Sequence, residues 1–149
     1  MKRTLFLLAF AATALFADNA KALFESKCMG CHIATKPTPE LRAKMVAPPA
    51  FGVMFHVKER YKDRKDAIEF IVSYAMKPDR NKSVCMPRTI KRFGLMPSMK
   101  GSVSESELEA IAGYMYDNFP PEWFSHPKQS GGCNGKKGCA SGSCGKNRG

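Results

Sequence analysis

Three absences limit what this chain of 149 residues can be. After residue 17 no apolar run approaches the roughly 20 residues that a membrane-spanning helix needs, which excludes a protein with several spans. No segment shows the apolar–polar alternation of a β-strand, so we expect an all-α class. Residues 125–149 contain no Leu, Ile, Val or Phe, and a segment without such side chains cannot form a core of its own.

Acidic residues are also scarce. The chain has 13 Asp and Glu against 24 Lys and Arg, a formal net charge of +11. The 25 residues after position 124 carry +5 of this charge and no acid. Such basicity favours acidic partner proteins or anionic lipid surfaces. Nucleic acid is the usual alternative for a basic chain, but the export signal described next argues against it.

The first 17 residues have the pattern of a cleavable secretion signal. Lys2 and Arg3 form a charged start, an apolar stretch covers residues 5–16, and Ala17 provides the small residue before the cut. The apolar stretch is too short to remain as a membrane anchor. We therefore predict export, with a mature protein that lacks a transmembrane segment and resides in the periplasm.

This pattern divides the chain into a signal peptide (1–17), one domain (18–124) and a flexible basic tail rich in Gly, Ser and Cys (125–149). A domain of that length buries only somewhat over 60% of its unfolded surface, so its core is modest and a bound cofactor would add stability.

The strongest motif lies at residues 28–32, which read CMGCH. This C-x-x-C-H pattern is the attachment signature of a c-type haem. Thiols at Cys28 and Cys31 have the spacing to reach the two vinyl groups on one porphyrin edge, and His32 follows directly to ligate the iron. A thioredoxin-like redox pair would need a βαβ setting, a zinc site would need a second ligand pair, and a disulfide would not require the histidine.

A sixth iron ligand must come from elsewhere, and Met96 is our first choice. Pro97 keeps Met96 out of helical geometry, as suits a loop that presents a thioether to a metal. Met99 is the near rival and Met86 a weaker one, while core packing is the commoner role of methionine. His56 would give bis-histidine ligation instead, although a packed or surface histidine is the simpler interpretation. A fourth rival, His126, is weaker still because it begins the tail.

Four helices are expected around the motif, at residues 19–27, 51–61, 65–76 and in the segment after Ser104. Ser104 and Glu107 form a capping box for the last helix, with Val103 and Leu108 as its hydrophobic staple. An apolar stripe follows and two prolines end it at Pro120.

A proline loop at residues 45–50 lies between the motif and these helices. An axial histidine usually donates its second ring N–H to a carbonyl or carboxylate. We expect a proline carbonyl of this loop to accept it, from Pro48 or Pro49, and take Pro49 as the candidate.

Over most of residues 19–119 the chain resembles a class I, monohaem cytochrome c. The resemblance rests on a helix ending in the CMGCH motif, on the Pro48-Pro49 loop, on Leu95-Met96-Pro97 and on the capped closing helix. It implies a small helical domain wrapped around one covalently bound haem, and electron transfer through an exposed haem edge.

Carried over by position, the resemblance implies Cys28 and Cys31 as thioether links, His32 as proximal ligand and Met96 as distal ligand. It also implies contact between the first and last helices through Phe24 and Tyr114. The basic run at residues 58–65 and the Cys-containing tail depart from the simple pattern.

Four cysteines remain besides the two in the motif: Cys85, Cys133, Cys139 and Cys144. In an oxidising compartment they are candidates for disulfides. The three tail thiols also suit a soft metal such as Cu(I), although their spacing matches no zinc finger.

The expected function is that of a periplasmic electron carrier, not an enzyme, which passes single electrons between redox proteins with acidic docking faces. The alternatives are a haem-based ligand sensor or peroxidase-like enzyme, which needs an open sixth position, and a metal-handling protein that uses the tail. The sequence does not separate a free shuttle from a subunit of an oxidase complex.

Overall fold

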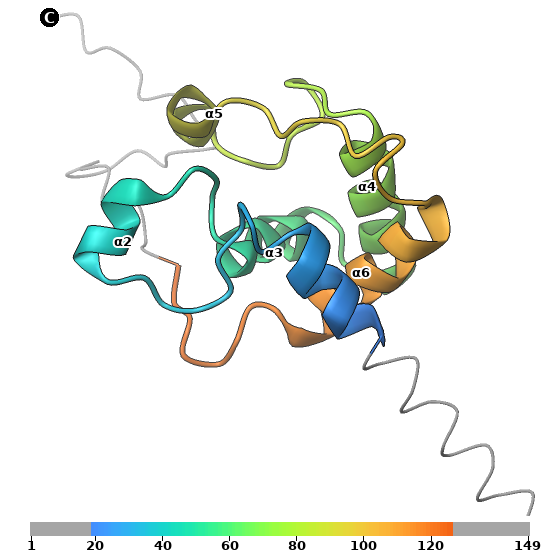
Figure 1. Ribbon diagram of the computed structural model, residues 1–149, viewed down its shortest axis with the longest axis horizontal. Helices are drawn as coiled ribbons and strands as arrows, with labels where there is room; N and C mark the ends of the chain where they lie inside the picture. The colour runs from blue at the N-terminus through green and yellow to red at the C-terminus, as the bar shows by residue number, and fades with distance from the viewer. Residues whose placement is uncertain (1–18, 127–149) are drawn as a thin grey trace, which may run out of the picture.

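The computed structural model describes residues 19–126, and these form helices joined by loops (Figure 1). A first helix covers residues 19–27. The others are α2 (Pro39–Lys44), α3 (Ala50–Arg60), α4 (Arg64–Met76), α5 (Pro87–Phe93) and α6 (Glu105–Asn118). Within 19–126 the only β-type pairing is an isolated bridge between Lys100 and Val103. The predicted all-α class is confirmed.

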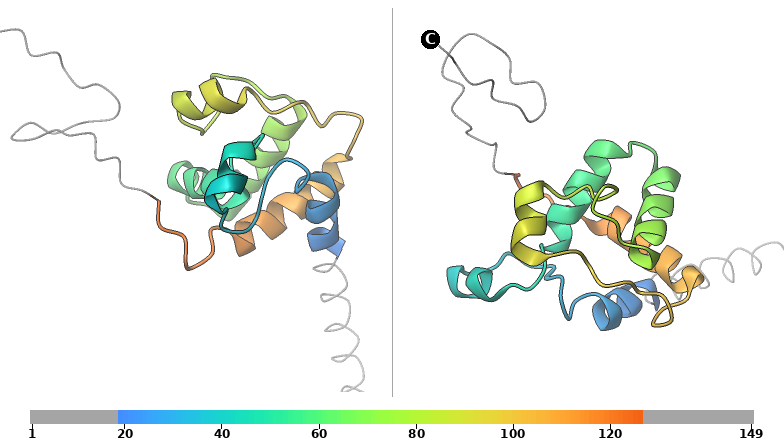
Figure 2. Two further views of the ribbon diagram at one scale, coloured as in Figure 1. Left: turned by 60° about the vertical axis from the view of Figure 1, so that its left-hand side comes forward. Right: turned by 90° about the horizontal axis from the view of Figure 1, so that it is seen from above.

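The helix over residues 19–27 packs against the end of α6, as Figures 1 and 2 show. The ring of Phe24 lies 5.4 Å from that of Tyr114 and 5.5 Å from that of Phe119, between centroids. Phe24 is only 1% exposed. The predicted Phe24–Tyr114 contact is confirmed, and it fixes the direction in which the chain enters the following CMGCH segment.

Helix α6 begins as its sequence predicts. The hydroxyl of Ser104 accepts from the backbone N–H of Glu107, and the Glu107 carboxylate accepts from the N–H of Ser104. Val103 and Leu108 are 5% and 2% exposed, as expected of the predicted staple. The capping box satisfies backbone donors that the first turn would otherwise leave unpaired.

Among helices α2 to α6, α4 and α6 make the most extensive contact. Arg64 at the start of α4 donates two hydrogen bonds to Asp117 near the end of α6, at 3.0 and 2.7 Å. A Cβ on Gly113 would come within 3.2 Å of the Arg64 guanidinium, so glycine leaves room for that side chain. The Arg64–Asp117 pair links the two helices on their solvent-exposed side.

Two short helices, α2 and α5, have no counterpart among those expected from the sequence. Each begins with a proline, at Pro39 and Pro87, where the missing N–H costs nothing. Thr38 caps α2, and α5 ends at Gly94, whose φ of 77° favours glycine. Helices of six and seven residues are too short for an apolar stripe to repeat, so the spacing of apolar residues could not predict them.

The signal predicted at residues 1–17 and the tail cysteines at 133, 139 and 144 lie outside the described residues. His126 packs on the domain, although the predicted division assigns it to the tail. His126 stacks on Phe55 with 4.5 Å between ring centroids. Among the helices within 19–126, none has the length and hydropathy to cross a membrane.

Candidate functional site

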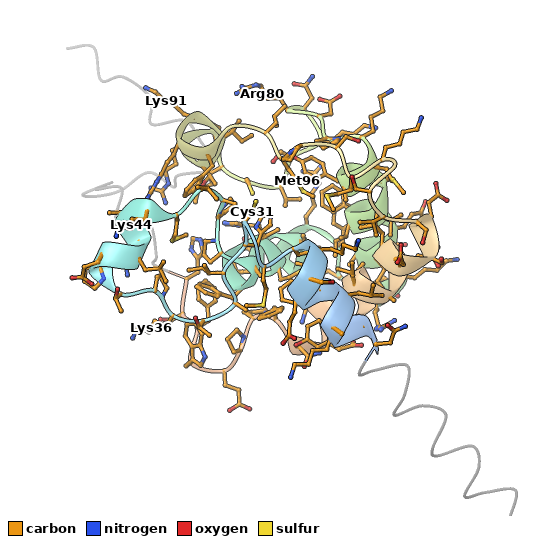
Figure 3. The ribbon with its side chains drawn as sticks, viewed as in Figure 1. Cys31, Lys36, Lys44, Arg80, Lys91 and Met96 are labelled. Atoms are coloured by element: carbon orange, nitrogen blue, oxygen red, sulfur yellow. The ribbon has the colours of Figure 1, made fainter. Side chains whose placement is uncertain are left out.

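A cavity of about 270 Å³ opens between segments that are far apart in the sequence. Its lining comes from the CMGCH segment, the proline loop, α3, α4, the turn before α5, α5 itself, residues 94–99 and α6. Residues 94–104 lead from α5 back to the start of α6 along one side of the molecule (Figure 2). Cys31 and Met96, labelled in Figure 3, both line this cavity.

The CMGCH segment extends the first helix by a tight turn. The N–H of Cys28 donates to Phe24 O at 2.9 Å, and the N–H groups of Cys31 and His32 both donate to Cys28 O, at 3.1 and 2.9 Å. Because the backbone coils back on itself here, both thiols and the imidazole line the same cavity. The packing of Phe24 against α6 therefore positions all three side chains.

Cys28 and Cys31 are free thiols in the structure. Burial, and secondarily the charge of Cys31, raises the pKa of Cys28 to about 11. A thioredoxin-like pair has the opposite property, a thiol whose pKa is lowered so that it reacts as thiolate. The raised pKa of Cys28 is therefore not the property that a reactive thiol of a dithiol redox pair would have.

The Nδ1 atom of His32 lies 2.7 Å from the carbonyl oxygen of Pro48. A carbonyl only accepts, so Nδ1 carries the proton and Nε2 keeps a free lone pair. Burial lowers the pKa of His32, against the smaller raising effect of the Pro48 hydrogen bond. A neutral imidazole with Nε2 available is the form that ligates a metal.

The choice of Pro49 as hydrogen-bond acceptor was wrong, and the acceptor is Pro48. The carbonyl of Pro49 accepts instead from the N–H groups of Gly52 and Val53, at 3.0 and 3.1 Å. Pro49 is the N-cap of α3, so its carbonyl points along that helix axis. The start of α3, which the sequence places one residue later, decides which proline faces the histidine.

Met96 lies in the extended segment between α5 and α6 and lines the cavity, as does Met99. The segment is fastened to α4 just after Met96, where the Ser98 hydroxyl donates to Met76 O at 2.6 Å and the Met99 N–H donates to Ala75 O at 2.9 Å. Met96 itself directly precedes Pro97. The thioether of Met96 is therefore presented by a short, anchored loop.

The other rivals do not share this cavity. Met86, His56 and His126 line a separate groove on the side of α2 and α5. His56 makes a 3.0 Å contact from Nδ1 to the carboxylate of its neighbour Glu59. This arrangement therefore does not support bis-histidine ligation through His56.

Two cavity-lining methionines escaped the sequence analysis as site residues. Met54 of α3 and Met115 of α6 line the cavity and are 0% and 9% exposed. Both residues lie on apolar helix faces. A methionine that lines a cavity and one that packs in the core look alike there in the sequence. The signal that distinguishes Met96 is its place in a loop before proline.

The remaining wall is largely apolar, from Val53, Val57, Phe70, Ile71 and Leu108 among others. Polar side chains are few and include Lys27, Tyr74, Ser83 and Thr89. Two thiols, an imidazole and thioethers within one largely apolar cavity form a donor set that fits a covalently bound haem.

Comparison with known proteins agrees with this geometry. Residues 16–115 match the family described as cytochrome c oxidase, cbb3-type, subunit III. The chain belongs to this family. It is thus a c-type cytochrome, and the predicted family is confirmed.

A similar relative is an uncharacterized protein of Aquifex aeolicus (strain VF5). It is 34% identical over 113 residues, which cover 68% of this chain and 74% of the relative. No solved structure matches the chain.

Cys85 contributes to the walls of both the cavity and the separate groove. Its thiol is free, and burial raises its pKa, against a smaller lowering by the Ser83 hydroxyl. A protonated, partly buried thiol is unreactive. Within 19–126 no cluster of three or more His, Cys, Asp or Glu could hold a metal ion, and the soft-metal site predicted on the tail lies outside these residues.

Proposed function

We propose that this cytochrome is a periplasmic carrier of single electrons, with a haem held by Cys28 and Cys31 and ligated by His32 and Met96. When bound, the haem iron supplies one-electron chemistry by cycling between Fe(II) and Fe(III). The observation that carries the proposal is the 2.7 Å contact from His32 Nδ1 to Pro48 O. It holds the imidazole in one tautomer and orientation, with Nε2 free for iron.

The chain's own residues set the redox behaviour. A thioether ligand from Met96 favours the ferrous state and so raises the reduction potential. The apolar walls act in the same direction because they disfavour the extra charge of the ferric form. Fastening of the Met96 loop through Ser98 keeps the sixth position closed, which favours electron transfer over ligand binding.

Exposed apolar side chains mark the mouth of the cavity. Val46 and Leu95 line the cavity and are 63% and 40% exposed, and Cys31, also in the lining, is exposed. Electrons would pass between partners at this mouth, where residues that line the cavity reach the surface. Basic residues around it, such as Lys27, would steer an acidic docking face to the mouth, and salt would weaken that attraction.

The export pattern of residues 1–17 supports a periplasmic location for this activity.

Visible spectroscopy of the exported holoprotein tests the proposal. We expect the oxidised form to show the weak far-red band of a sulfur–iron(III) bond, the reduced form to ignore carbon monoxide, and a redox titration to follow a reversible one-electron curve. A wild-type protein that lacks the band and binds carbon monoxide readily would support the sensor or enzyme alternative instead.

A further inference from the structure

A second hollow lies beside the haem cavity, between the proline loop, α2, α5 and the start of α3. It is a groove of about 600 Å³, closed at one end by residues 123–126. It contains neither His32 nor Met96. None of its side chains is used in the proposed haem ligation, so the groove needs an explanation of its own.

The charge of the groove is one-sided. Four cationic side chains line it, namely Lys36, Arg42, Arg88 and Arg92, and the lining includes no Asp or Glu. Within the described chain none of the four forms an ion pair with a carboxylate. Figure 3 shows further cations on the same side, with Lys44 at α2 and Lys91 on α5. Unneutralised like charges around one hollow favour an anionic occupant.

One of these cations is held in place. The Arg92 guanidinium donates to the carbonyl oxygen of Arg42 at 2.7 Å, which ties α5 to α2 across the groove. It also lies over the ring of Phe93, 4.6 Å from its centroid. An arginine that is fixed before binding loses less conformational freedom when a carboxylate arrives.

The groove also presents an aromatic anchor. Trp123 is 50% exposed, although its ring meets Phe51 edge-on at 5.0 Å between centroids. Phe51 in turn contacts Phe124 at 4.9 Å. Trp123 and the arginines line the same groove, and tryptophan and arginine are among the residue types that dominate the binding energy of protein interfaces.

The groove and the haem cavity share a wall. Five residues line both hollows: Pro48, Val53, Cys85, Thr89 and Phe93. Pro48 is also the residue whose carbonyl accepts from His32. An occupant of the groove is therefore separated from the haem ligand by a single layer of protein that contains a hydrogen-bonded connection.

We propose that this groove binds an acidic segment of a redox partner protein, with carboxylates on Arg42, Arg88 and Arg92 and an apolar side chain against Trp123. This deepens the proposed carrier function and rests on it. A concave groove with an aromatic anchor suits a protruding peptide segment. A bilayer surface is flat, so it would meet the rim cations but leave the interior empty.

Calorimetry at low ionic strength tests this on the full-length holoprotein. The probe is a blocked Glu-rich peptide with a central Phe, and its Gln-for-Glu counterpart is the reference. We expect Arg42→Gln/Arg88→Gln to bind the probe about tenfold more weakly than wild type, as two lost charge contacts imply. These two positions leave the Arg92 bridge intact, since it uses the backbone of Arg42.

The matched control is Lys65→Gln/Lys100→Gln, which removes the same charge from exposed positions that line neither hollow. It should change the affinity less than about twofold. Trp123→Ala should weaken binding of the Phe-containing probe roughly fivefold or more, and Trp123→Phe should restore part of it. Trp123 is the only tryptophan of the chain, so a change in its emission locates the peptide.

Three results would overturn the proposal: no binding by wild type, equal weakening by the control pair, or full competition by vesicles of anionic phospholipid. The visible spectrum of each variant separates a failure of the groove proposal from a failure of the carrier proposal. Normal haem spectra without peptide binding contradict the groove alone, whereas peptide binding by a protein without the sulfur–iron band contradicts the carrier alone.

Discussion

His32 and Pro48, sixteen residues apart, are joined by a contact of 2.7 Å between the ring Nδ1 and the backbone carbonyl. It connects the CMGCH turn to the proline loop and fixes which ring nitrogen faces the cavity. Because the acceptor is a backbone atom, its strength depends on the conformation of the loop and not on the side chain. In the proposed function the loop would therefore help to tune the haem iron through His32.

Loosening that loop should raise the reduction potential. Pro48→Gly keeps the carbonyl but frees the backbone, so the hydrogen bond weakens, the imidazole becomes less basic and the ferric state loses stabilisation. We expect a rise that is a fraction of the about 59 mV equivalent to a tenfold one-electron equilibrium change. Potentiometry checks it. Pro49→Gly is the control, and an equal rise there would contradict the assignment of Pro48.

The hydroxyl of Ser98 should keep the distal loop closed. Its hydrogen bond to Met76 O, at 2.6 Å, is worth about 0.5–1.5 kcal/mol net. Ser98→Ala should therefore increase the fraction of reduced protein with an open sixth position roughly two- to tenfold, measured as the rate of carbon monoxide binding. Ser102→Ala is the matched control, because the Ser102 side chain has no such contact. Unchanged binding in Ser98→Ala would show that the loop closes without this bond.

The Arg64–Asp117 pair makes a pH-dependent contribution to stability. The hydrogen bond from Arg64 is the first cause that lowers the pKa of Asp117. A lowered native pKa means that the contribution is complete above the ordinary aspartate value near 4 and is lost as the pH falls through the lower native value.

Both side chains are about half exposed, so we expect Asp117→Asn to cost only about 0.5–1 kcal/mol of unfolding free energy at neutral pH. The cost should shrink as the pH falls through the lowered native pKa of Asp117 and disappear below it. Urea unfolding of holoprotein, repeated from neutral pH into acid, measures it, with Asp79→Asn as a control outside the pair. If Asp117→Asn still lowers the unfolding free energy in acid, the effect of the substitution comes from packing and not from the charge of Asp117.

Four helices were predictable because each leaves a strong local signal. The capping box at Ser104 and Glu107 fixed the start of α6 to the residue, and periodic apolar positions placed α3 and α4 within one residue of their starts. The CMGCH motif pointed to Cys28, Cys31 and His32, which line one cavity, because these residues lie within five consecutive positions of the sequence. These features depend on neighbours in the sequence, which is why sequence alone is sufficient for them.

The rest depends on contacts between distant segments. Pro48 and Pro49 are chemically alike, and only the start of α3 decides which carbonyl is free for His32. The short helices α2 and α5 are stabilised by contacts such as Arg92 to Arg42 O, fifty residues apart, which no local pattern reveals. The groove between them was for the same reason invisible in the sequence.

The most direct test of His32/Met96 ligation compares Met96→Ala with Met99→Ala in the holoprotein, since both residues line the cavity. We predict that Met96→Ala loses the far-red sulfur–iron(III) band, binds carbon monoxide when reduced, and has a potential lower by about 120 mV or more, a hundredfold change in the one-electron equilibrium. Met99→Ala should keep all three wild-type properties. The opposite pattern, with the band lost in Met99→Ala and kept in Met96→Ala, would contradict the account.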